Sequence, residues 1–286
     1  MSDSLSHTNV CLEDIQTAHI TQQVETANTL YPDENLTAVQ LDGATVAITT
    51  PLFTQKLNRV CGFAVNTPVT ESTLDKIEDL FRAVSVQPFI ELSPFACPGA
   101  REMLEARGYT VSGHINTHIL SLKEYTLPVD NENNNISITR IVPTDKNDES
   151  KRVFTDIAVE AFKPGGRSIE LLTALATIAV RRPDTHLYLA HIDNKPVGCA
   201  AVAVLDTKHG QVPLFYMTGT LSDFQGRGVQ GALLRTGLRD VKQAGLEIAV
   251  METRPGGASA RNAGRVGFRV AYVKETFTPV YRAGRE

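Results

Sequence analysis

The sequence contains few cysteines, and they are not spaced as disulfide partners or metal ligands are. Cys11, Cys61, Cys97 and Cys199 lie far apart in a chain of 286 residues, and no CxxC pair occurs. This distribution excludes a disulfide framework and a zinc cluster. We therefore expect no metal and a reducing, cytoplasmic setting.

Long hydrophobic runs are absent as well. The longest apolar stretch, Val197–Leu205, contains Gly198 and is too short to cross a bilayer. The N-terminal segment MSDSLSHTNV has neither a basic start nor an apolar core, so we expect no secretory signal. With 42% hydrophobic and 21% charged residues, the composition excludes collagen-like and disordered chains. These features predict a soluble globular protein without a membrane partner.

The net charge of −4 is unevenly distributed along the chain. Residues 225–286 contain 11 Lys and Arg against 5 Asp and Glu, although the whole protein is acidic. A local basic block is typical either of a site for an anionic small molecule or of a solvated surface, and charge alone favours the surface. We expect no nucleic-acid partner.

A polar, Asn-rich segment divides the chain into halves of similar length. It predicts a domain over residues 1–126, a linker over 127–136 and a second domain over 137–286. The halves resemble each other, because 98–109 and 255–268 both run from Pro-Gly through a short helix to Gly-aromatic. This repeat indicates an internal duplication.

The second half has the clearer order of elements. Alternating apolar residues predict antiparallel strands over 185–192, 197–205 and 212–220, joined by tight turns. The glycine-rich loop 225–231 then opens a long helix, and a further strand covers 246–253. In the first half, a strand is expected over 59–65. A helix with an apolar stripe follows it, but NTPVTEST takes the place of the glycine loop.

The glycine loop QGRGVQG is a candidate cradle for a diphosphate. Unpaired N–H groups at a helix start attract anions, and glycines let a phosphate approach the main chain. A P-loop is excluded, since no Gly-Lys-Ser/Thr follows. The dinucleotide fingerprint is matched by Gly226, Gly228 and Gly231, with Glu252 ending the next strand. However, LSDF separates the preceding strand from the first glycine and tight hairpins precede the loop, so we reject that interpretation.

The order meander, glycine loop, helix, strand, short helix and strand resembles the GNAT superfamily of acyl-CoA N-acyltransferases. Gln225-x-x-Gly228-x-Gln230 matches the family loop at all but its last position, and Asn262 followed by Gly267-Phe268 resembles a later family segment. The resemblance covers about residues 137–280, and the first half looks like a degenerate copy. It implies a mixed α/β fold of two GNAT-like domains, each with a central, mostly antiparallel sheet flanked by helices.

The resemblance also implies a site for acetyl-CoA as co-substrate. The main chain of Thr218, Gly219 and Thr220 would bind the pantetheine arm like an added strand. Asn262 would lie near the thioester. The main-chain amides expected to receive the diphosphate are those of Gly226, Arg227, Gly228, Val229, Gln230 and Gly231. The arginines considered for the ribose phosphate are Arg227, Arg261 and Arg265.

Two positions depart from the family pattern. Ala263 stands where the family often has an acid tyrosine, and Leu214 stands where some members have a glutamate base. The remaining catalytic candidates are Tyr216 and Glu252, for which the structural alternatives are a core aromatic and one half of an ion pair. His118 alternates with apolar residues on a strand and lacks the spacing of a metal ligand.

We therefore expect an N-acetyltransferase that moves an acetyl group from acetyl-CoA to a primary amine of a small molecule. The first half would wall the acceptor cleft and replace a dimer partner, in a monomer or a homodimer. The alternative is a non-catalytic acyl-CoA-binding regulatory module. A nicotinamide-dependent oxidoreductase is a third hypothesis.

Overall fold

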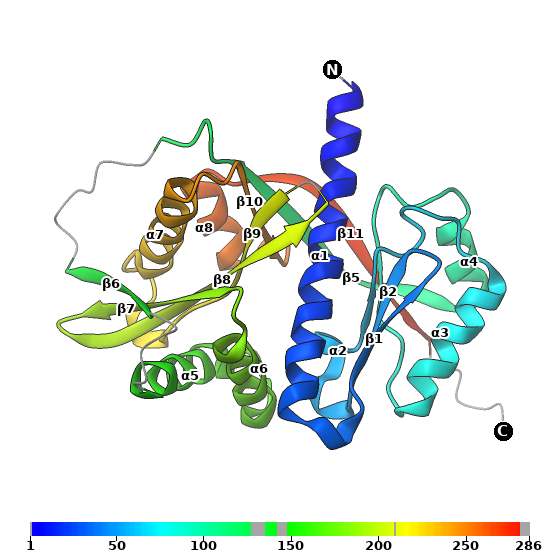
Figure 1. The fold of residues 1–286 in the computed structure, drawn as a ribbon, viewed down its shortest axis with the longest axis horizontal. Coiled ribbons are helices and arrows are strands. Elements are labelled where there is room, and N and C mark those ends of the chain that lie inside the picture. Colours follow the sequence, from blue (N-terminus) through cyan, green and yellow to red (C-terminus); the bar gives the residue numbers. More distant parts are fainter. Residues whose placement is uncertain (1, 127–134, 142–147, 209, 281–286) are drawn as a thin grey trace. The chain divides into compact units, whose positions relative to one another are not determined.

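The computed structural model describes residues 2–126, 135–141, 148–208 and 210–280, with the backbone alone for residues 2–11 and 148. Its internal contacts divide the chain into two compact units. Unit 1 comprises Met1–Asn116 and Tyr272–Glu286, and unit 2 comprises Thr117–Ala271. Each unit is built around its own part of a β-sheet with helices packed on it (Figure 1).

Unit 1 has the strand order β1-β2-β3-β4-β11-β5. Strands β1 and β2, β2 and β3, and β4 and β11 pair antiparallel, whereas β3 and β4 pair in parallel. Its elements are α1 (Ser2–Leu30), β1 (Thr37–Leu41), β2 (Ala44–Ile48), α2 (Thr54–Leu57), β3 (Arg59–Cys61), α3 (Glu71–Ala83), β4 (Ile90–Leu92), α4 (Ala100–Ala106), the first part of β5 (Tyr109–Ser121) and most of β11 (Arg269–Pro279).

The hydrophobic core of unit 1 lies between the sheet and the helices α3 and α4. Leu74, Ile77 and Phe81 on α3 are buried, as the apolar stripe of that helix predicts. They pack with Ile90 of β4 and Phe277 of β11. The C-terminal strand is therefore part of the first core.

Unit 2 has the strand order β5-β10-β9-β8-β7-β6. Helices α5 and α6 cover one face of its sheet, and α7 and α8 cover the other (Figure 1). Its elements are the last part of β5, β6 (Ile136–Ile141), α5 (Asp148–Phe162), α6 (Ile169–Arg181), β7 (Thr185–Ile192), β8 (Lys195–Thr207), β9 (Gly210–Thr220), α7 (Val229–Gln243), β10 (Ile248–Thr253), α8 (Ala258–Val266) and the first residues of β11. The meander β6-β7-β8-β9 is antiparallel, and β9 pairs with β10 in parallel.

The predicted mixed α/β fold with flanking helices is confirmed, but the described strands belong to one 11-stranded sheet and not to the two separate sheets expected. The strand expected over 59–65 is wrong beyond Cys61, because Gly62 and Ala64 both have positive φ and turn the chain away. The contacts assign residues 117–126 to unit 2 and 272–286 to unit 1, whereas the predicted domains are 1–126 and 137–286. The predicted linker falls largely on 127–134, outside the described residues.

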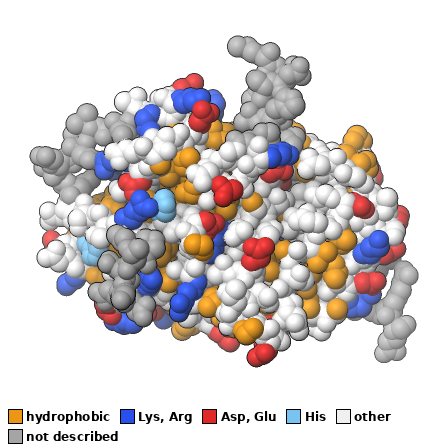
Figure 2. Space-filling view, in the orientation of Figure 1, with side chains coloured by type: hydrophobic (Ala, Val, Ile, Leu, Met, Phe, Trp, Pro, Cys, Tyr) orange, Lys and Arg blue, Asp and Glu red, His pale blue; other side chains and the backbone are white. Residues whose placement is uncertain are grey.

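Two surface properties bear on the expected partners. Within the described ranges, no helix is long and apolar enough to cross a membrane. Acidic and basic side chains are intermixed on the face drawn in Figure 2. Of the basic residues after position 225, Lys274 is fully buried, so the C-terminal basic block is only partly a surface feature.

Candidate active site

The parallel pairing of β9 with β10 is short. It covers Val250 opposite Leu214 and Met251 opposite Phe215, although both strands continue further. Beyond Met251 no further residues of the two strands pair, and we call the ends that follow, Tyr216–Thr220 of β9 and Glu252–Thr253 of β10, the split. Main-chain groups of a strand that lack a strand partner can pair with an extended ligand.

A β-bulge on β9 lies beside this split. The register with β8 passes from Ala201 opposite Tyr216 to Cys199 opposite Gly219, so β9 contains one extra residue. Met217 within the bulge has φ of 49°, which is unusual for a residue with a side chain. Cys199 is buried, as expected for a core residue, and its thiol lies 3.8 Å from the Met217 carbonyl oxygen.

The residues after the bulge are those expected to hold the pantetheine arm. The hydroxyl oxygen of Thr218 is buried and has no hydrogen-bond partner among the described residues. Gly219 is closely packed, because an added Cβ would stand 2.8 Å from the Cβ of Ala161 on α5. A buried hydroxyl without a partner costs free energy, and a polar ligand in the split would satisfy it.

The glycine loop leads directly into α7. Gly228 is the N-cap, and among the described residues no side chain caps this helix end. Gly226 and Gly228 have φ of 77° and 85°, and no described atom comes within 4 Å of a Cβ built on either. The first N–H groups of α7 therefore lack a side-chain cap, and uncapped N–H groups at a helix start attract anions.

The corresponding helix of unit 1 begins differently. The hydroxyl of Thr70 accepts a hydrogen bond from the Thr73 amide at 3.2 Å, and Glu71 lies in the first turn of α3. This cap satisfies an amide, and the carboxylate of Glu71 would repel a phosphate. Thus α7 begins without a side-chain cap, whereas α3 has a capped and acidic start.

Tyr216 is placed on the face of the sheet that carries α5 and α6. Its hydroxyl is 3.1 Å from the Thr185 hydroxyl, and the Arg182 guanidinium lies over its ring at 5.8 Å. Arg182 in turn forms a bidentate ion pair with Asp184. Burial raises the pKa of Tyr216, so the phenol stays protonated at neutral pH.

Glu252 is the penultimate residue of β10, at the split. The Thr117 hydroxyl on β5 donates to its carboxylate at 3.4 Å. Met251 on its N-terminal side belongs to the core under α7 and α8. Because side chains alternate along a strand, Glu252 points to the opposite face, the face of Tyr216.

Asn262 on α8 is tied to α7. Its amide nitrogen donates to Gln230 at 2.6 Å, and its oxygen accepts from Arg265 at 2.9 Å. Gln230, the residue that departs from the family loop pattern, also donates to Ser259 at 3.2 Å. These bonds join the start of α7 to α8 and hold the loop in place.

The arginines considered for the ribose phosphate differ in their contacts. Arg227 is exposed and lies 5.1 Å above the Phe224 ring, next to the uncapped amides of α7. Arg261 donates to the Gly256 carbonyl at 2.7 Å. Arg227 is thus the arginine best placed to meet a phosphate.

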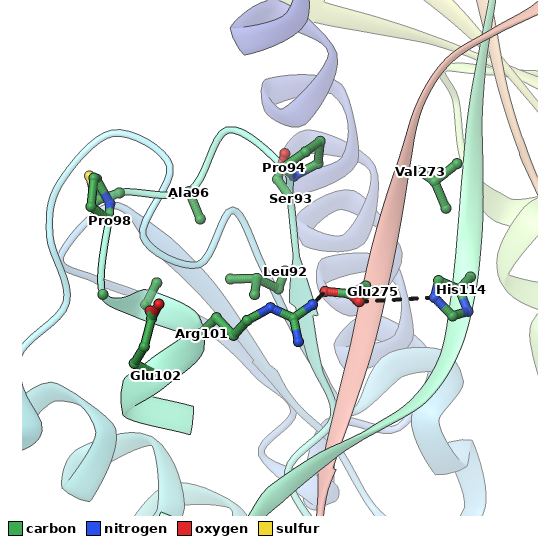
Figure 3. A pocket seen from close by; sticks show the side chains of 13 residues that line it. Leu92, Ser93, Pro94, Ala96, Pro98, Arg101, Glu102, His114, Val273 and Glu275 are labelled. Carbon is green, nitrogen blue, oxygen red and sulfur yellow. Dashed lines mark hydrogen bonds and ion pairs between the residues drawn. The ribbon is translucent and has the colours of Figure 1, made fainter. Parts of the chain in front are cut away.

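A separate cavity of about 560 Å³ lies in unit 1, next to α4. Arg101 is ion-paired with Glu275 on its floor, and His114 lies 4.0 Å from the same carboxylate (Figure 3). It contains none of the residues predicted to bind the coenzyme. Among the described residues, no group of three His, Cys, Asp or Glu side chains could hold a metal ion.

Comparison with known proteins identifies the class of this site. Residues 152–268 match the model of the acetyltransferase (GNAT) family. The matched segment runs from α5 through α8 and includes the split, the bulge and the glycine loop. This segment of the chain is therefore similar to GNAT domains. No curated protein matches the chain in sequence.

Solved structures show the same fold over most of the chain. A GCN5-related N-acetyltransferase from Kribbella flavida is similar with a TM-score of 0.63 and 16% identity, covering 91% of this chain and 96% of that one. A tandem GNAT protein from the clavulanic acid biosynthesis pathway gives 0.60 and 14%, covering 85% and 79%. A GCN5-related N-acetyltransferase from Sphaerobacter thermophilus gives 0.57 and 14%, covering 91% and 86%. The fold is that of GNAT proteins, including a tandem one.

Proposed function

We propose that this protein is an acetyl-CoA-dependent N-acetyltransferase whose coenzyme site lies in unit 2. The observation that carries the proposal is the uncapped start of α7 near the split between β9 and β10. The similarity to GNAT domains supports acyl transfer in general, and the uncapped amides support a ligand with a diphosphate. Acetyl-CoA combines that diphosphate with an extended arm.

The residues around the split fit the two ends of such a ligand. We propose that the amides from Gly226 to Gly231 receive the diphosphate, with Arg227 as a mobile countercharge. The main chain of Thr218, Gly219 and Thr220 would pair with the amide groups of the pantetheine arm, and the Thr218 hydroxyl would gain the partner that it lacks. Unit 1 would bind no coenzyme, because α3 is capped.

The chemistry proposed for the split is direct transfer. A neutral primary amine attacks the thioester carbonyl, and an N–H group of the β9 bulge stabilises the developing oxyanion. Of the two catalytic candidates, we favour Glu252 as the proton acceptor, because it stands at the end of β10. The Tyr216 hydroxyl already contacts Thr185, so we assign this residue to shaping the acceptor side.

The acceptor we propose is a small molecule with a primary amine. The proposed setting is the cytoplasm, which the buried thiol of Cys199 suits, and the proposed state is a monomer or homodimer. Asn262 is proposed to act indirectly, through its bond to Gln230, in keeping the loop start fixed near the thioester arm.

Calorimetry with acetyl-CoA and with NAD(P), followed by thiol release with a panel of primary amines, tests the proposal. We expect acetyl-CoA to bind, NAD(P) not to bind, and at least one small amine to release coenzyme A. Coenzyme binding without thiol release for any amine would support the regulatory module instead. Binding of NAD(P) alone would contradict the proposal and favour the oxidoreductase.

A further inference from the structure

A buried histidine in unit 2 has a hydrogen-bonding arrangement that the proposed reaction does not yet use. His118 on β5 is 2% exposed, and its Nε2 lies 2.8 Å from the hydroxyl of Thr253. Its Nδ1 is buried without a partner among the described residues. A buried nitrogen without a hydrogen-bond partner lowers the stability of the fold, so the presence of one at His118 calls for a physical explanation.

Thr253 stands at the wall of the split. Pairing of the two strands ends with Met251 opposite Phe215, and Thr253, two residues further, is the last residue of β10. Thr253 shares a face with Met251, whose side chain packs in the core with Ala263 of α8. Thr253 is therefore placed on the same face of β10 as Ala263, where the resemblance to GNAT proteins implies an acid tyrosine.

The partners of the ring define its tautomer. Burial lowers the pKa of His118, and no charged side chain contributes to that shift, so the ring is neutral at pH 7. A neutral ring has one N–H, and an N–H left alone in the core is rarer than a lone pair left alone. The hydrogen is thus assigned to Nε2, which donates to Thr253. The threonine hydroxyl then accepts from His118 and keeps its own hydrogen for a further acceptor.

We propose that Thr253, held by the positioning residue His118, donates a hydrogen bond to the sulfur of the departing coenzyme A. This inference rests on the proposed function. As the C–N bond forms and the C–S bond breaks, the electron pair stays on sulfur and the amine proton goes to Glu252 or to water. The thiolate is stabilised by Thr253 and later takes a proton from water. The neutral hydroxyl of Thr253 thus stabilises the thiolate, which is part of the role expected of the tyrosine that Ala263 replaces.

Free coenzyme A bound to the full-length protein tests this without any acceptor amine. The ultraviolet absorbance of the thiolate gives the pKa of the bound thiol in wild type, Thr253→Val and Thr253→Ser. We expect about a tenfold higher thiolate-to-thiol ratio in wild type than in Thr253→Val at a given pH, which is about one pKa unit. Thr253→Ser should keep the wild-type value. His118→Leu should shift the ratio in the same direction as Thr253→Val.

Acetyl-CoA serves as the control ligand, because it has no titrating thiol and should bind all four proteins alike. Arg227, Arg254, Arg261 and Arg265 remain in every variant, so any effect of these cations on the thiol cancels in the comparison. If neither coenzyme binds wild type, the proposed function itself fails. If coenzyme A binds and its thiol titrates identically in wild type and Thr253→Val, the proposed function stands and this inference is refuted. A Thr253→Ser variant that behaves like Thr253→Val also refutes it.

Discussion

Replacing Gly228 with glutamate should abolish tight coenzyme binding while leaving the fold intact. The residue has φ of 85°, and no described atom lies within 4 Å of an added Cβ, so the new side chain projects from the start of α7 without a clash. The left-handed backbone costs a side-chain residue about 1–2 kcal/mol. A carboxylate at a helix N-terminus returns about 0.3–1 kcal/mol.

The effect on the ligand follows from charge. A carboxylate about 5 Å from a phosphate charge repels it by about 0.8 kcal/mol at the dielectric constant of water and by about 3 kcal/mol at an effective value of 20. The coenzyme diphosphate has two such charges. We therefore expect the dissociation constant of acetyl-CoA to rise by at least about thirtyfold, or about 2 kcal/mol. Raising the salt concentration should reduce the loss.

Gly245 supplies the matched control at the other end of the same helix. Its φ is 82° and no described atom lies within 4 Å of an added Cβ, so Gly245→Glu carries the same backbone cost. The negative helix end adds a further cost there, and Gly245→Glu should melt at a lower temperature than Gly228→Glu. Calorimetry should show wild-type affinity for Gly245→Glu. Equal affinities for the two variants would refute the assignment of the diphosphate to the α7 start.

Two further outcomes follow from unit 1 and from the division of the chain. Lys274→Met removes one partner of the buried Glu91 carboxylate. Burial raises the pKa of Glu91, but the charges of Lys274 and Arg59 lower it by more, so the pKa lies below its usual 4.5. Because the pKa of Glu91 is lower in the folded state, its contribution to stability is fully present above about 4.5 and is lost as the pH falls from there through the folded-state pKa. Urea unfolding should therefore show a loss of about 3 kcal/mol at pH 7 that shrinks as the pH falls below about 4.5, and a pH-independent loss would contradict this. Residues 1–126 and 137–286 produced as two chains should co-purify through a tag on one of them, because 117–126 belong to unit 2 and 272–286 to unit 1. Two separately folded, non-associating fragments would contradict that division.

Elements with a strong local period could be predicted from the sequence. The stripe of Leu74, Ile77 and Phe81 identifies α3, and alternation identifies the meander of unit 2. Ser168 caps the start of α6, since its hydroxyl accepts from the Leu171 amide at 3.2 Å, and a serine just before an apolar run is a local signal for a helix start. By contrast, the residues of β1 are all exposed or partly exposed, so its sequence shows no alternation of apolar and polar residues. Periodicity reports burial, so a strand at the edge of a sheet leaves little trace.

Long-range partners could not be predicted, because local sequence does not specify which strand lies alongside another. Phe277 looked like the end of the second half, yet it packs in the core of unit 1. The same limit applies to the candidate site. Glycine spacing pointed to the α7 start, but the contact of Tyr216 with Thr185 and of His118 with Thr253 joins residues far apart in the chain. Only the fold brings those pairs together.

The place of β11 in unit 1 also bears on how the chain folds as it is made. Glu91 is 1% exposed and needs the ammonium of Lys274, whose nitrogen lies 2.5 Å from its carboxylate. While the ribosome is still synthesising the residues before β11, that carboxylate has no lysine to meet, and the sheet of unit 1 lacks a strand between β4 and β5. The N-terminal unit therefore cannot finish folding first, as leading domains generally do. It must wait, partly open, until the residues of β11 have emerged.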